Sequence, residues 1–135
     1  MRLLFFSLIS TFFLHAGVLP ANITPQKFID TYGKVKILDQ KELNYKSIKG
    51  VKFTELSDLA YHRKTGILYF VGDKGMLYSF RTDFSEKIDT FMPLDAKVLK
   101  RKSGKNFRSW QRDSEGLTLD GKGRLLISFE GDKPK

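Results

Sequence analysis

The sequence contains no cysteine among its 135 residues. Disulfide bonds, thiolate nucleophiles and cysteine-ligated metal centres are therefore excluded. The fold must be stabilised by packing, for which 41% hydrophobic and 13% aromatic residues provide enough material, or by a bound hard cation. A hard cation would take oxygen ligands.

Histidine is scarce, and the glycine motifs of common enzymes are missing. Of two histidines, only His62 lies beyond the N-terminal segment, in a turn with Arg63 and Lys64, where we expect an exposed residue rather than a general base. The chain has no Gly-x-Ser-x-Gly motif, so a serine hydrolase is poorly supported. It also lacks a phosphate-binding loop of the P-loop or dinucleotide type.

Acidic residues are the minority, with 15 against 24 lysines and arginines, a net charge of +9. This balance favours anionic ligands or surfaces as partners.

Residues 1–21 have the order of a secretory signal peptide. Arg2 precedes an apolar run over residues 3–14, and small residues follow, so cleavage is predicted after Ala16 or Ala21. The run is shorter than the roughly 20 residues of a membrane span; an uncleaved anchor or a buried helix is the alternative. We therefore expect a periplasmic or secreted protein with a mature domain over residues 22–135, no stable membrane span and no nucleic-acid partner. Its oligomeric state is left open.

Two look-alike segments, residues 56–73 and 114–130, dominate the rest of the chain. Each has the pattern of a short strand, a polar turn with glycine, a second apolar strand and an acidic residue at its end. Leu59 and Leu117 are 58 residues apart, and Leu68 and Leu125 are 57 apart. This spacing is slightly above the roughly 40–50 residues of common β-propeller blades.

The first copy continues into a predicted four-stranded antiparallel meander, and another half-exposed strand is expected from Lys34. The predicted strands of the meander are Leu56–Tyr61, Ile67–Gly72, Met76–Arg81 and Lys87–Phe91. Because residues 67–71 are continuously apolar, we expect a strand buried on both faces, either between blades or in a sandwich core. The second copy stops after two strands. The predicted fold is all-β: about one and a half to two four-stranded blades of a β-propeller, a fragment of a closed ring.

Residues 97–112 interrupt the strand pattern with seven basic residues, no acidic residue, and Phe107 and Trp110 between them. We expect a solvated loop with Trp110 packed on the blade. The alternative is a surface that captures phosphate or another polyanion, with Arg108 and Arg112 as substrate contacts.

Carboxylates mark equivalent places in the two copies. Asp73 and Glu130 end second strands, whereas Asp113 and Glu115 stand at the entry to an inner strand. Neighbouring blades would present them on one face, as ligands for calcium or for a metal that polarises a phosphoryl group. The alternative is that they cap turns through backbone hydrogen bonds.

Taken together, the segments resemble the phytase-like domain of the family named for "esterase-like activity of phytase". The resemblance spans about residues 51–131, with aspartate at Asp58 where the family usually has glycine and His62 where it often has aspartate. The motifs that carry it are Ser57-Asp58-Leu59-Ala60-Tyr61, Gly66-Ile67-Leu68-Tyr69, Gly72-Asp73-Lys74-Gly75, Asp113-Ser114-Glu115-Gly116-Leu117 and Glu130-Gly131. The resemblance implies an exported propeller of roughly six blades with acidic residues around its central channel.

Two classes of function follow. One is a metal-assisted hydrolase of a small anionic phosphate ester or of a carboxylic ester, with Glu115 and Glu130 as catalytic residues, Asp73, Asp113 and Glu115 as calcium ligands, and Arg108 and Arg112 as substrate contacts. The other is a non-catalytic envelope binding or scaffold propeller, or a truncated chain without function. An enzyme should leave these carboxylates unpaired, whereas a scaffold should bond them to backbone amides.

Overall fold

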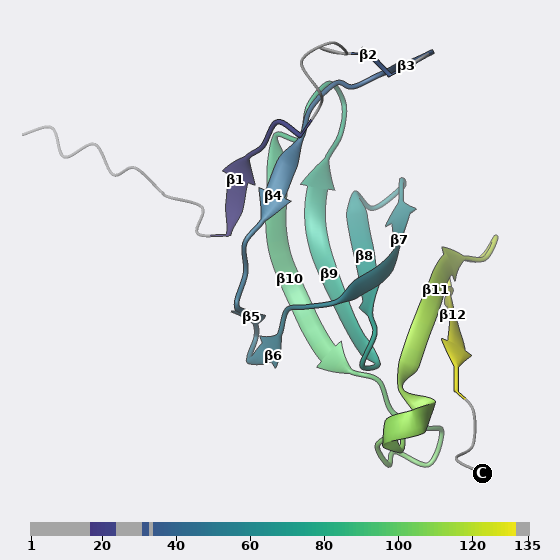
Figure 1. Cartoon of the computed structure of the whole chain (residues 1–135). Coiled ribbons are helices and arrows are strands. Elements are labelled where there is room, and N and C mark those ends of the chain that lie inside the picture. The colour runs from purple at the N-terminus through teal and green to yellow at the C-terminus, as the bar shows by residue number, and fades with distance from the viewer. Residues whose placement is uncertain (1–16, 24–30, 33, 132–135) are drawn as a thin grey trace, which may run out of the picture.

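The computed structural model describes residues 17–23, 31–32 and 34–131 (Figure 1). Nearly every described element is a β-strand, and the helix η2 (Ser109–Gln111) is a single 3-10 turn. The predicted all-β class is therefore confirmed. No helix among the described residues is long and apolar enough to cross a membrane.

The predicted meander is present as a four-stranded antiparallel sheet in the order β10-β9-β8-β7. Its strands are β7 (Leu56–His62), β8 (Ile67–Gly72), β9 (Met76–Asp83) and β10 (Thr90–Val98). Gly66 and Gly75 stand in the β7–β8 and β8–β9 turns at φ of +64° and +67°, a conformation that costs glycine little. This sheet has the strand number and connectivity of one propeller blade.

The prediction for the fourth strand was wrong. We expected a strand over Lys87–Phe91 and a loop from Lys97, whereas β10 runs from Thr90 to Val98. Pro93 lies within β10, which tolerates proline because it is the edge strand. The register also shifts between Pro93 and Asp95, which hides the alternating apolar pattern from the sequence. The loop is consequently shorter than expected.

Strand β8 is covered on both faces, as its continuous apolar sequence predicted. Leu68 and Phe70 belong to one core with Tyr78, Phe80, Ala96 and Ile48, whereas Val71 belongs to a second core with Ala60 and Leu117. The first core is closed by residues 43–53. The second is closed by the hairpin of β11 (Asp113–Leu119) and β12 (Leu125–Glu130), which packs beside β7 and β8 (Figure 1).

The β7–β8 and β11–β12 hairpins, which we call the inner hairpins, repeat one another in detail. Strand β7 has a bulge at Ser57, because its register with β8 shifts between Leu56 and Asp58. Strand β11 has the same bulge at Glu115, 58 residues later. The sequence repeat is therefore a structural repeat, comprising one complete four-stranded sheet and one hairpin. No closed ring of blades is present in the described part of the chain.

Short paired strands make up the N-terminal part. They are β1 (Val18–Pro20) with β4 (Lys41–Leu43), β2 (Thr31–Tyr32) with β3 (Val35–Lys36), and β5 (Ser47–Ile48) with β6 (Val51–Lys52). The strand expected from Lys34 is thus present as the short β3. The pairing of β4 to β1 was not predicted.

The predicted signal peptide lies largely outside the described residues and stays a prediction, but β1 bears on where it would be cut. The amide of Asn44 donates to the Gly17 carbonyl at 2.6 Å, and that of Ala21 donates to Gln40 at 3.3 Å. Cleavage after Ala21 would remove β1 and leave β4 without its partner. We therefore expect that a signal peptidase would cut after Ala16, so that N-terminal sequencing of the processed chain reads Gly17-Val18-Leu19. A mature chain beginning at Asn22 would contradict this.

Candidate functional site

The predicted acidic residues meet where the two inner hairpins open toward each other. Asp73 directly follows β8, and its backbone amide donates to the carbonyl of Glu55 at 2.9 Å. Asp113 begins β11 and lies directly opposite Glu130, the last residue of β12. Like charges directly opposite each other in an antiparallel pair are destabilising. The repeat thus places an acidic pair at the open end of each hairpin.

Three of these carboxylates converge on one point. Ligand oxygens of Asp73, Asp113 and Glu115 all lie within 4.8 Å of one another, and we call this group the junction cluster. Asp113 and Glu115 lie two residues apart on β11, and side chains at that spacing face the same side of a strand.

The charges of the junction cluster disfavour each other. A hydrogen bond with Asp113, then desolvation and the charge of Asp113, raise the pKa of Asp73. Desolvation, followed by the hydrogen bond and charge of Asp113 and the charge of Glu130, raises the pKa of Glu115. Perturbed carboxylates of this kind gather at functional sites, although structural clusters also produce them.

Other aspartates show what a purely structural carboxylate looks like in this chain. Asp120 accepts from the backbone amides of Lys122 and Arg124 at 2.9 and 2.8 Å, and these bonds lower its pKa. No backbone amide or basic side chain among the described residues bonds a carboxylate of the junction cluster or of Glu130. By the criterion set out from the sequence, the cluster differs from a turn cap.

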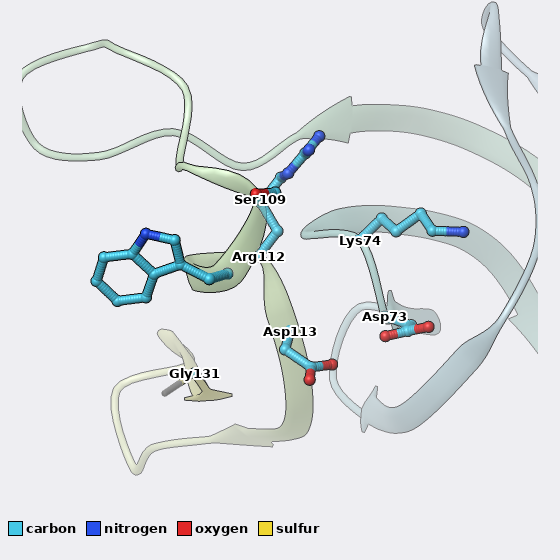
Figure 2. A pocket seen from close by; sticks show the side chains of 7 residues that line it. Asp73, Lys74, Ser109, Arg112, Asp113 and Gly131 are labelled. Carbon is cyan, nitrogen blue, oxygen red and sulfur yellow. The ribbon is translucent and has the colours of Figure 1, made fainter. Parts of the chain in front are cut away.

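The junction cluster borders a pocket of about 410 Å³. Its lining residues are Asp73, Lys74, Ser109, Trp110, Arg112, Asp113 and Gly131. Figure 2 shows the carboxylates of Asp73 and Asp113 facing the same space, with Lys74 and Arg112 extending away from it. Lys74 pairs with Glu55 at 2.6 Å. The lining of the pocket thus includes two acidic and two basic residues.

Two close contacts hold the β11–β12 hairpin against the four-stranded sheet and against η2. The hydroxyl of Ser114, which is fully buried, donates to the carbonyl of Gly72 at 2.5 Å. A Cβ on Gly131 would lie 2.3 Å from the carbonyl oxygen of Trp110, so only glycine permits this approach. In the Glu130-Gly131 motif, Glu130 therefore ends β12 and Gly131 makes the contact between this end of the strand and η2.

Replacing Gly131 by alanine is expected to push η2 away from β12, because the new methyl group would clash with backbone rather than with a flexible side chain. Overpacking of this kind costs about 1–3 kcal/mol. Urea unfolding of the full chain measures it, and Gly121→Ala is the control because nothing lies within 4 Å of a Cβ there. Equal stability of the two variants would contradict the expected clash.

The structure brings together most of the predicted site residues, but not all. Asp73, Asp113 and Glu115 form the junction cluster, Glu130 lies opposite Asp113, and Arg112 lines the pocket. Arg108 is exposed and is not among the described lining residues, so the geometry gives no support to its predicted contact with substrate.

Sequence reasoning missed the pocket roles of Lys74, Ser109, Trp110 and Gly131. Lys74 follows Asp73 directly, which was a usable signal. Ser109 and Trp110 lie in the basic loop and could not be placed without the contact between η2 and β12.

Comparison with known proteins assigns the chain to a family. A family model described as "Phytase-like: Esterase-like activity of phytase" matches residues 51–135, which include both inner hairpins and the junction cluster. No curated protein and no solved structure matches the chain. The match covers more than half of the sequence, so the chain belongs to the phytase-like family described by esterase-like activity of phytase.

Proposed function

We propose that this chain is part of an exported phytase-like β-propeller that binds calcium at the junction cluster and hydrolyses a small anionic ester there. The observation that carries the proposal is the convergence of Asp73, Asp113 and Glu115 within 4.8 Å, with no hydrogen bond from a backbone amide and no ion pair to them among the described residues. The family description, which joins phytase and esterase activity, supports ester hydrolysis as the reaction class.

Calcium fits the donor set. It prefers carboxylate and carbonyl oxygens, usually six to eight of them, and tolerates irregular geometry. The junction cluster offers an oxygen from each of three side chains, and the chain has no cysteine that would favour a softer metal. A bound divalent cation supplies neutralising charge and polarises a phosphoryl or carbonyl oxygen.

Two basic residues that line the pocket support an anionic substrate. Lys74 and Arg112 both line the pocket. The hydrogen bond and charge of Glu55 raise the pKa of Lys74, and the nearby charge of Arg112 lowers it. Arginine binds phosphate and carboxylate groups through paired donors. We assign Arg112 as the principal substrate contact, with Lys74 beside it, while Arg108 stays a predicted contact.

Glu115 and Glu130 are the proposed acid–base pair. Glu130 lies opposite Asp113, and its charge helps to raise the pKa of Glu115. Carboxyl groups with displaced pKa values are suited to proton transfer near neutral pH. In this assignment Glu130 accepts a proton from the water that attacks the ester, the bond to the leaving alcohol breaks, and Glu115 gives that alcohol a proton. Glu115 is thus shared between cation binding and proton transfer.

The second candidate is a non-catalytic propeller that binds or scaffolds in the cell envelope. The acidic and basic residues of the pocket would then serve binding alone, and the fold of the described residues is compatible with that role. The junction cluster favours the first candidate, because no backbone amide among the described residues bonds it, whereas a purely structural carboxylate should resemble Asp120 with its amide partners.

The test measures hydrolysis of p-nitrophenyl phosphate and p-nitrophenyl acetate by the full chain, with calcium and with chelator. We expect calcium-dependent hydrolysis of at least one ester, lost in Glu130→Gln and weakened in Arg112→Ala, with Glu86→Gln as an exposed control. Calcium binding without hydrolysis of either ester would favour the binding candidate. Absence of both would refute the proposal.

A further inference from the structure

Asp58 links the two hairpins through its carboxylate. It lies on β7, half-buried, and its Oδ2 accepts a hydrogen bond from the backbone amide of Leu117 on β11 at 2.7 Å. Its Oδ1 accepts from the amide of Leu59 at 2.8 Å. The bond from Leu59 fixes the Asp58 side chain on its own strand. The bond from Leu117 therefore holds β11 at a defined place.

This hydrogen bond lies beside the bulge at Glu115. Leu117 is the second residue after Glu115, and between them Gly116 lies very close to Ser128 of β12 and in ordinary contact with Asp58. A Cβ on Gly116 would lie 2.6 Å from Ser128 Oγ and 4.0 Å from Asp58 Oδ2. The backbone of β11 is thus held on one side by Asp58 and on the other by pairing to β12.

A second hydrogen bond restrains β11 on the other side of Glu115. Ser114, on the other side of Glu115, bonds the Gly72 carbonyl at 2.5 Å, so Glu115 lies between two tethers that both start on the first sheet. Asp73, which follows Gly72, belongs to that same sheet. The distance from Glu115 to Asp73 therefore depends on how β11 is attached to β7 and β8.

We propose that Asp58 is a positioning residue for the junction cluster: by accepting the Leu117 amide it holds β11 against β7 and so keeps the Glu115 carboxylate beside that of Asp73. This inference rests on the proposed calcium site. Asp58 itself is not a ligand. The residue at this position would set the cation affinity of the cluster, because its carboxylate fixes where β11 lies relative to β7.

The experiment compares Asp58→Ala, Asp58→Asn and Asp120→Ala in the full chain. Calorimetric titration measures calcium affinity, and amide hydrogen exchange of Leu117 measures the tether in the calcium-free protein. Asp58→Asn keeps an acceptor for the Leu117 amide. Asp120→Ala removes a carboxylate that also bonds two backbone amides of the β11–β12 hairpin, but far along the strand from Glu115.

We expect Asp58→Ala to weaken calcium binding by about tenfold, the lower end of the range for residues that orient metal ligands. Exchange at Leu117 should accelerate. Asp58→Asn should restore most of both properties, and Asp120→Ala should lower stability while leaving calcium affinity unchanged.

Two results would overturn the inference. One is an Asp58→Ala variant with normal calcium affinity despite lost protection at Leu117, which would make Asp58 only a fastener between strands. The other is unchanged protection at Leu117. If the wild type binds no calcium, the proposed function fails, and the positioning role is judged from the backbone amide resonance of Glu115. A shift of that resonance in Asp58→Ala, with rescue in Asp58→Asn, would uphold the positioning role. An unmoved resonance would overturn it.

Discussion

Replacing Phe80 by alanine is expected to remove a large share of the stability of the domain. Phe80 is fully buried on the central strand β9. Its ring centroid lies 4.8 Å from that of Phe91, 5.6 Å from that of Phe70 and 5.8 Å from that of Tyr45. Truncating a buried phenylalanine costs about 3–5 kcal/mol through lost transfer free energy and the cavity that remains. Domains of this size are stable by only about 5–15 kcal/mol.

The loss should appear as a much lower midpoint in urea unfolding followed by circular dichroism. Phe129→Ala is the matched control, because Phe129 is 39% exposed and contacts one ring, that of Phe107. We expect the control to lose far less stability. If the two variants unfolded at the same urea concentration, the first core would not be the main source of stability.

The second large effect is expected for Asp113→Asn, whose effect on the free energy of unfolding should change sign when calcium is added. Without calcium, Asp113→Asn should stabilise the protein, because it removes a charge that faces Asp73, Glu115 and Glu130. With calcium, the same change should destabilise it relative to wild type, because a cation ligand is lost. Saturation at about 100 times Kd stabilises a folded protein by about 2.7 kcal/mol.

Thermal unfolding with calcium and with chelator measures both signs. Asp89→Asn is the control, since Asp89 is exposed and lies outside the pocket at the junction. A variant that is less stable than wild type under both conditions would show that Asp113 has a structural role instead.

The calcium-free reversal should depend on pH. Because the folded pKa values of Asp73 and Glu115 are raised, their contribution to stability is present when they are protonated and is lost as pH rises through those folded values. The advantage of Asp113→Asn should therefore grow from about pH 4 to about pH 7. It should shrink in high salt, which screens exposed charges.

Much of this architecture could be predicted because its signals are local. The turn glycines and the apolar run of β8 identified the hairpins and the double burial of Val71 and Phe70. The repeat placed Asp73 and Glu130 at equivalent strand ends, which was enough to expect that acidic residues of adjacent hairpins would meet.

The rest depends on contacts that leave little trace in the sequence. Pro93 concealed the true extent of β10, because its tolerance depends on an edge position that only the sheet order reveals. The place of Trp110 depends on the approach of Gly131 to its carbonyl, and the role of Asp58 on an amide 59 residues away. Pairings between distant residues of this kind cannot be found by periodicity.

The central claim is that the junction cluster binds a hard cation, and sensitised terbium luminescence tests it most directly. Trp110 is the single tryptophan of the chain and lines the pocket beside Asp73 and Asp113, so it can transfer excitation to a terbium ion bound there in place of calcium. We predict saturable emission on tryptophan excitation, displaced by calcium, lost in Trp110→Phe and greatly weakened in Glu115→Gln. Absence of sensitised emission, or emission that Glu115→Gln leaves unchanged, would contradict the account.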